Sequence, residues 1–192
     1  ARVERLLRQI TLPEKIALLS GTNEMDTLAL PRLGIPALRM TDGPHGVRDG
    51  KATCLPTGVA MGATWNPRLV QAAGMLLARE TLAKGRNVLL GPCVNIHRSP
   101  LGGRNFESFG EDPHLAAQLA VAYVKGVQSQ RVAASTKHFA CNNEEADRGY
   151  VDVAVSERAL HEIYLPAFEA DASHYFEDSI RQYFYMTSGG RP

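Results

Sequence analysis

The sequence contains few cysteines, one tryptophan and no long apolar segment. Its three cysteines, Cys54, Cys93 and Cys141, are odd in number and widely spaced, and none belongs to a C-x-x-C motif. This set excludes a fully paired disulfide framework and the common zinc and redox motifs. We therefore expect free thiols and a cytoplasmic chain. A leader peptide removed before residue 1 would leave no trace in this sequence.

The sequence also lacks a surplus of one charge. Lys and Arg number 21 and Asp and Glu number 20, which gives a formal net charge of +1. The basic residues are scattered, so there is no electrostatic footprint for nucleic acid. No apolar run approaches about 18 residues, so no membrane span is predicted. With 192 residues, 44% of them hydrophobic, the chain can bury a single core.

Short apolar segments alternate with segments that have helical periodicity. Strands are predicted at residues 37–41, 87–92 and 132–139. Helices are predicted to follow the capping residues Thr11, Asn66, Asp112 and Ser156, three of which precede a proline or a capping-box sequence. Residues 95–111 are predicted to form a long polar loop. This alternation is typical of an α/β fold with parallel strands covered by helices.

Charged side chains follow the predicted strands. Asp42 closes the first strand, residues 98–107 lie in the loop after the second, and Lys137 and His138 lie near the end of the third. The carboxyl ends of parallel strands lie together and carry the chemistry of such folds. Carboxylates and guanidinium groups can each bind two neighbouring hydroxyls through strong hydrogen bonds. The sequence therefore predicts a site for a polyhydroxylated ligand.

Simpler interpretations exist for these residues. Asp42 could be a turn residue, Arg104 could be a surface ion-pair partner, and the acidic residues at 144–147 could form a solvated loop. His138 and Cys141 have no third ligand at a suitable spacing, so no metal site is predicted.

Three segments together resemble the N-terminal domain of family 3 glycoside hydrolases, the β-glucosidase and β-xylosidase group. They are RMTDGPHGVR at 39–48, GPCVNIHRSPLGGRNFE at 91–107 and TKHF at 136–139. The resemblance runs from about residue 12 to residue 168. It implies a partial, or half, TIM-type (β/α) barrel with roughly four βα units. We place this domain at residues 1–172 and an atypical tail at residues 173–192.

The resemblance also implies roles for individual residues. Asp42 would accept hydrogen bonds from a terminal sugar, whose other hydroxyls would contact Arg104, Lys137 and His138. Arg98 and Glu107 would orient these groups. The full candidate set for substrate binding is Asp42, Arg98, Arg104, Lys137, His138, Arg148 and Tyr150. The implied ligand is a β-linked glucoside or oligosaccharide, and no cofactor is implied.

The sequence departs from the family in its catalytic carboxylates. Retaining glycosidases need a nucleophile and an acid/base about 5–5.5 Å apart. The family nucleophile lies in a Ser-Asp-Trp-like motif, and the acid/base usually comes from a second domain. Neither is found here, and the single tryptophan, Trp65, lies elsewhere. The catalytic residues are therefore unassigned, and the carboxylates that could substitute are Asp42, Glu107 and Glu145.

Three functions remain open from the sequence. The first is a β-glucosidase-like hydrolase of terminal β-D-glucosyl bonds. The second is an inactive fragment or sugar-binding half-barrel, and the third is a metal-dependent hydrolase on a partial barrel. Open strand edges and uncovered apolar surface predict a homodimer or a higher oligomer.

Overall fold

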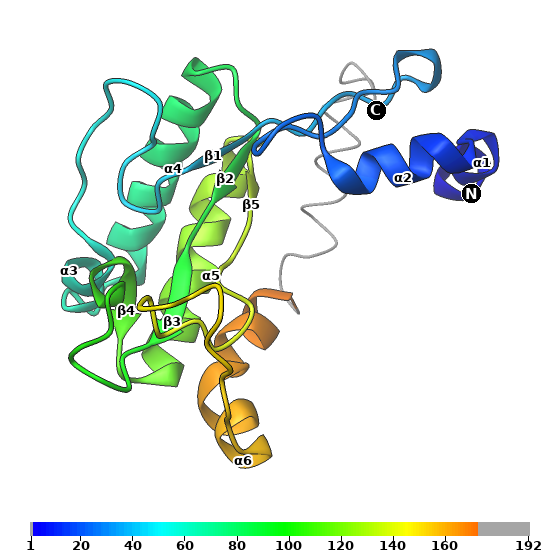
Figure 1. Cartoon of the computed structure of the whole chain (residues 1–192). Helices are drawn as coiled ribbons and strands as arrows, with labels where there is room; N and C mark the ends of the chain where they lie inside the picture. Colours follow the sequence, from blue (N-terminus) through cyan, green and yellow to red (C-terminus); the bar gives the residue numbers. More distant parts are fainter. Residues whose placement is uncertain (1, 173–192) are drawn as a thin grey trace.

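The computed structural model describes residues 2–172, and residue 1 and residues 173–192 lie outside this part (Figure 1). The atypical tail predicted at residues 173–192 therefore falls outside the described residues. Within the described part, none of the helices has both the length and the apolar character needed to cross a bilayer.

Two short helices, α1 (Arg2–Gln9) and α2 (Leu12–Ser20), extend away from the sheet at the N-terminal end (Figure 1). The predicted capping box begins α2, because the backbone N–H of Thr11 donates to Oε2 of Glu14 at 2.8 Å. Gly21 follows the helix with a φ of 72°, a conformation that favours glycine. A 3-10 turn, η1 (Pro31–Leu33), precedes the first strand.

The main sheet has three parallel strands in the order β1-β2-β5. They are β1 (Met40–Asp42), β2 (Val88–Leu90) and β5 (Ala133–Ala134). Each lies within or beside a predicted strand but is shorter. Gly91 and Pro92 separate β2 from the next strand, and Pro92 has no N–H for the ladder. After β5, the chain leaves β2 and pairs Lys137 with Cys93 instead.

A second pair of parallel strands, β3 (Cys93–Ile96) and β4 (Ser108–Gly110), corrects the prediction of one polar loop over residues 95–111. The 3-10 turn η2 (Asn105–Glu107) leads directly into β4. Helix α3 (Gly58–Gly62) packs so closely here that a Cβ on Gly58 would lie 2.2 Å from the carbonyl oxygen of Glu107. Ser108 and Phe109 are buried under this contact, which only tertiary packing creates.

Two long helices, α4 (Pro67–Ala83) and α5 (Pro113–Ser129), pack against each other and against the strands (Figure 1). Their predicted caps are confirmed, because the side chains of Asn66 and Asp112 accept hydrogen bonds from the first helical N–H groups. A Cβ on Gly126 would lie 2.1 Å from the carbonyl oxygen of Gln71, so the helices approach through glycine. Buried apolar residues of α4 and α5 form most of the core, together with residues of β2, β3 and β4.

The last described helical region begins at the predicted cap, Ser156, whose Oγ accepts from the N–H of Ala159 at 3.2 Å. It comprises α6 (Glu157–Ala159), the π-helical segment η3 (Leu160–Tyr164) and helical residues 166–172. Each main-sheet strand is thus followed by helix further along the chain. The predicted α/β class with parallel strands and covering helices is confirmed.

Candidate functional site

The site forms where β1, η2 and the segment after β5 meet. Asp42 is the last residue of β1, and Lys137 lies three residues beyond β5. The Nζ atom of Lys137 donates a hydrogen bond of 2.7 Å to Oδ1 of Asp42 and lies 3.8 Å from Oε2 of Glu107. One ammonium group therefore lies between two carboxylates from separate elements.

Arg104 extends this arrangement. Its Nε lies 2.5 Å from Oε1 of Glu107, and its Nη1 lies 3.6 Å from Oε1 of Glu145. We call Asp42, Lys137, Glu107, Arg104 and Glu145 the ion-pair network. The Glu107 side chain is only 1% exposed, and a carboxylate so deeply buried needs cationic partners to remain ionised. Despite the close contact with Arg104, Oε1 of Glu107 accepts no well-aligned hydrogen bond among the described residues.

The pKa of Asp42 reflects two opposing effects. Burial raises the pKa of the carboxyl, but the hydrogen bond and charge of Lys137 outweigh burial and hold the pKa below its ordinary value. Asp42 is therefore an ionised hydrogen-bond acceptor at neutral pH. Its side chain remains 16% exposed, so it can be reached from solvent.

His138 is held as a neutral imidazole. Burial, followed by the charges of Arg104 and Lys137, lowers its pKa to about 4. Its backbone N–H donates to Oδ1 of Asn95 at 3.0 Å, and the amide of Asn95 also contacts the carbonyl oxygen of Asn142. A neutral imidazole has one donor and one acceptor, which suits a sugar hydroxyl.

The turn after Asp42 is fixed by close packing. Gly43 has a φ of 124°, and a Cβ there would lie 2.0 Å from the carbonyl oxygen of Gly46, so only glycine fits. The backbone N–H of Gly43 donates to Oδ1 of Asp42 at 2.8 Å. Tyr123, fully buried on α5, donates its hydroxyl to the carbonyl oxygen of Pro44 at 3.0 Å. The long helix thereby holds the backbone beside Asp42.

The structure separates the remaining predicted residues from this cluster to different degrees. Arg98 is exposed, with its guanidinium 5.8 Å from the centre of the Tyr164 ring. Arg148 is exposed but joins the network's outer end, 3.3 Å from Oε2 of Glu145. Tyr150 is 94% exposed. Sugar binding by these three residues stays a prediction. The three carboxylates considered as catalytic substitutes all belong to the network, and their catalytic role is likewise only a prediction.

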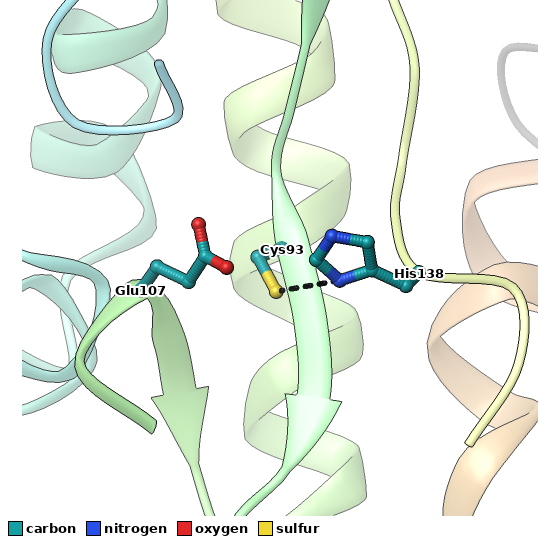
Figure 2. Close-up of side chains that lie close together, drawn as sticks. All are labelled: Cys93, Glu107 and His138. Carbon is teal, nitrogen blue, oxygen red and sulfur yellow. Dashed lines mark hydrogen bonds between the residues drawn. The ribbon is translucent and has the colours of Figure 1, made fainter. Parts of the chain in front are cut away.

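Sequence reasoning missed Cys93. The structure places its Sγ 3.7 Å from Nδ1 of His138 and 3.1 Å from Oγ of Ser108. Figure 2 shows the thiol between the imidazole of His138 and the carboxylate of Glu107. Cys93 lies within one of the three family-like segments, but its pairing with Lys137 in a parallel bridge has no local signal. The sequence predicts no metal site at His138 and Cys141, and the sulfur neighbour of His138 in the structure is Cys93 instead.

Comparison with known proteins identifies the family of the chain. The chain matches the family model described as "Glycosyl hydrolase family 3 N terminal domain" over residues 7–175. The chain therefore belongs to this family.

Relatives at high identity support the same assignment. A β-glucosidase of Rhizobium radiobacter is 49% identical over 174 residues, which cover 87% of this chain and 21% of the relative. A probable β-glucosidase I of Aspergillus clavatus is 51% identical over 172 residues, covering 86% of this chain and 20% of the relative. The chain thus spans about a fifth of the length of these relatives, with 21% and 20% covered.

Solved structures extend the likeness to the fold. The Kluyveromyces marxianus β-glucosidase in complex with glucose superposes with a TM-score of 0.86 at 46% identity, covering 90% of this chain and 21% of that one. The Thermotoga neapolitana β-glucosidase 3B in complex with glucose gives 0.83 at 41% identity, covering 90% and 28%. The predicted partial barrel is therefore confirmed.

Proposed function

We propose that this chain forms the sugar-binding part of a β-glucosidase-type glycoside hydrolase. The observation that carries the proposal is the Lys137–Asp42 hydrogen bond of 2.7 Å, which joins an ionised acceptor to a strong donor at one end of the sheet. Arg104 and the neutral His138 belong to the same region. The β-glucosidase relatives, two of them solved with glucose, support a glucoside as the ligand.

The chemistry of these groups suits a terminal sugar. Asp42 accepts hydrogen bonds from two neighbouring hydroxyls, while Lys137 and Arg104 donate to hydroxyl oxygens. His138 either donates or accepts, because its imidazole is neutral. These contacts bind and orient the ring that carries the scissile bond, which is a prerequisite for attack at its anomeric carbon.

The carboxylates of the network are better suited to binding than to bond cleavage. A general acid of a glycosidase needs a raised pKa, whereas the pKa of Asp42 is lowered. Glu107 is buried and paired with Arg104, with Lys137 nearby. We therefore propose that hydrolysis by this chain alone is weak, and that cleavage depends on a carboxylate pair outside this network.

Isothermal titration of the chain with glucose tests sugar binding. We expect Asp42→Asn to weaken binding by a factor of about 10 or more, since hydrogen bonds to a charged group contribute about 1.5–3 kcal/mol each. Asp49→Asn is the matched control, because Asp49 is exposed and, among the described residues, its carboxylate forms an ion pair only with Arg86, at 3.6 Å. Equal affinities for wild type and Asp42→Asn would refute the proposed role of Asp42.

Hydrolysis of an aryl β-glucoside separates the remaining functions. We expect wild type and Asp42→Ala, prepared identically, to release the aryl group no faster than the protein-free blank. Activity of the wild type that is lost in Asp42→Ala would instead show that the chain itself hydrolyses the glucoside. Activity removed by EDTA would favour a metal-dependent hydrolase.

A further inference from the structure

We propose that Cys93, Glu107 and His138 form a binding site for a thiophilic divalent cation of the zinc and cadmium type. One ligand atom from each residue, a sulfur, a carboxylate oxygen and a ring nitrogen, lies within 4.8 Å of the other two. The three side chains come from β3, η2 and the segment after β5, and the thiol of Cys93 lies between the other two groups (Figure 2). The binding itself does not depend on the proposed sugar function.

The spacing of two of the donor atoms, the sulfur and the ring nitrogen, fits a tetrahedral ion. Zinc binds sulfur at about 2.3 Å and nitrogen at about 2.0–2.1 Å, which at a tetrahedral angle separates the two ligands by about 3.6 Å. Sγ of Cys93 and Nδ1 of His138 are 3.7 Å apart. Three protein ligands would leave a fourth position open for water or another small ligand, as in zinc sites that exchange a ligand.

Glu107 can bind a metal while it keeps its cationic partner. Its Oε1 lies 2.5 Å from Nε of Arg104 but accepts no well-aligned hydrogen bond among the described residues, and a carboxylate has enough lone pairs for both. Coordination needs a neutral imidazole and a thiolate, so binding of the metal would release the proton of the Cys93 thiol to water.

The local charge balance also permits a cation. The ion-pair network contains three carboxylates and two cationic groups, so its formal charge is −3 + 2 = −1. Formation of the Cys93 thiolate makes the charge −2, which one divalent ion neutralises. Arg48 and Arg148 pair with the network from outside, where side-chain exposures of 65% and 57% allow water to screen them. The sulfur ligand selects zinc or cadmium over magnesium and calcium.

The site shares two residues with the proposed sugar site. A bound metal ion would occupy Nδ1 of His138 and one oxygen of Glu107. Competition between the ion and a sugar would follow, and this consequence alone rests on the proposed function. The binding site can be tested without any sugar.

Cadmium is the probe, because cadmium–thiolate bonds give an ultraviolet charge-transfer band. The test uses the 192-residue chain with Cys54→Ser and Cys141→Ser, so that Cys93 is its only thiol. We expect a saturable band with one equivalent of cadmium. Adding Cys93→Ser should abolish the band, and adding His138→Gln, which keeps the thiol, should weaken binding by about 10-fold or more. Circular dichroism verifies that each variant is folded.

Two results would overturn the proposal. One is the absence of a saturable band in the chain whose only thiol is Cys93. The other is an unchanged cadmium affinity in the His138→Gln variant, which would mean that the thiol binds the ion without the imidazole. Because neither readout involves a sugar, failure here leaves the proposed function standing, and failure of glucose binding leaves the metal site standing.

Discussion

The Nζ atom of Lys137 lies 2.7 Å from Oδ1 of Asp42, although the two residues are 95 positions apart in the sequence. The same ammonium faces Glu107, so Lys137 links the end of β1, the turn η2 and the segment after β5. The contact therefore stabilises the fold and at the same time holds the groups proposed to bind a sugar.

Removing the ammonium should destabilise the chain. We expect Lys137→Met to lower the free energy of unfolding by about 2–3 kcal/mol, because two half-buried or buried carboxylates lose their shared partner. Lys125→Met, on the exposed side of α5, is the matched control and should change stability by less than about 0.5 kcal/mol. Urea unfolding followed by circular dichroism measures both. Equal stabilities would mean that the ion pair contributes nothing to folding.

Asp42 should make stability depend on pH in acid. Its pKa is lowered in the folded chain from the ordinary value of 3.8, so the unfolded state binds the proton more readily. The stabilisation by Asp42 is therefore present above about pH 4 and is lost as the pH falls through the folded pKa. We expect the difference in the free energy of unfolding between wild type and Asp42→Asn to shrink as the pH falls below about 4. A difference that stays constant down to the acid transition would contradict the lowered pKa.

Tyr123→Phe should loosen the backbone beside Asp42. The substitution removes the hydroxyl that donates to the carbonyl oxygen of Pro44 and leaves a buried acceptor unpaired, at a cost of about 1–2 kcal/mol. Glucose affinity should fall as well, since Pro44 lies two residues from Asp42. Tyr150→Phe, at a 94% exposed residue, should leave stability unchanged. Unaltered stability and affinity in Tyr123→Phe would show that this hydrogen bond does not position the turn.

The exposed face of α2 should promote self-association. Leu12, Ile16 and Leu19 are 69%, 57% and 90% exposed and lie at helical spacing on one side. We expect light scattering to give a multiple of the 20.9 kDa chain mass, and Leu19→Glu to reduce it. Leu101→Glu, at a 91% exposed loop position, is the control. A wild-type mass equal to one chain would contradict the predicted oligomer.

The helix starts could be predicted from the sequence because their signals are local. Thr11, Asn66, Asp112 and Ser156 each lie within three residues of the groups they cap. Strand boundaries depend on partners far along the chain. Strand β4 was therefore missed, since Ser108 and Phe109 lie among polar residues and become buried only when α3 packs on them.

The candidate site likewise contains residues that could be predicted from the sequence and residues that could not. Asp42, Arg104 and Lys137 could be predicted from charge and from their position after apolar segments, and the family resemblance pointed to the same residues. Cys93 could not, because its contact with His138 spans 45 positions and is created by the parallel bridge to Lys137. The role of Tyr123 depends on how α5 packs against the turn after β1, which no local pattern in the sequence reveals.

A crystal structure of the chain at saturating glucose would test the central claim most directly. We expect one sugar ring with hydroxyl groups within hydrogen-bonding distance of the Asp42 carboxylate and of Lys137, Arg104 or His138. A ring bound elsewhere, or no ring at this end of the sheet under conditions where calorimetry shows saturation, would contradict the assignment of these residues to a sugar-binding site.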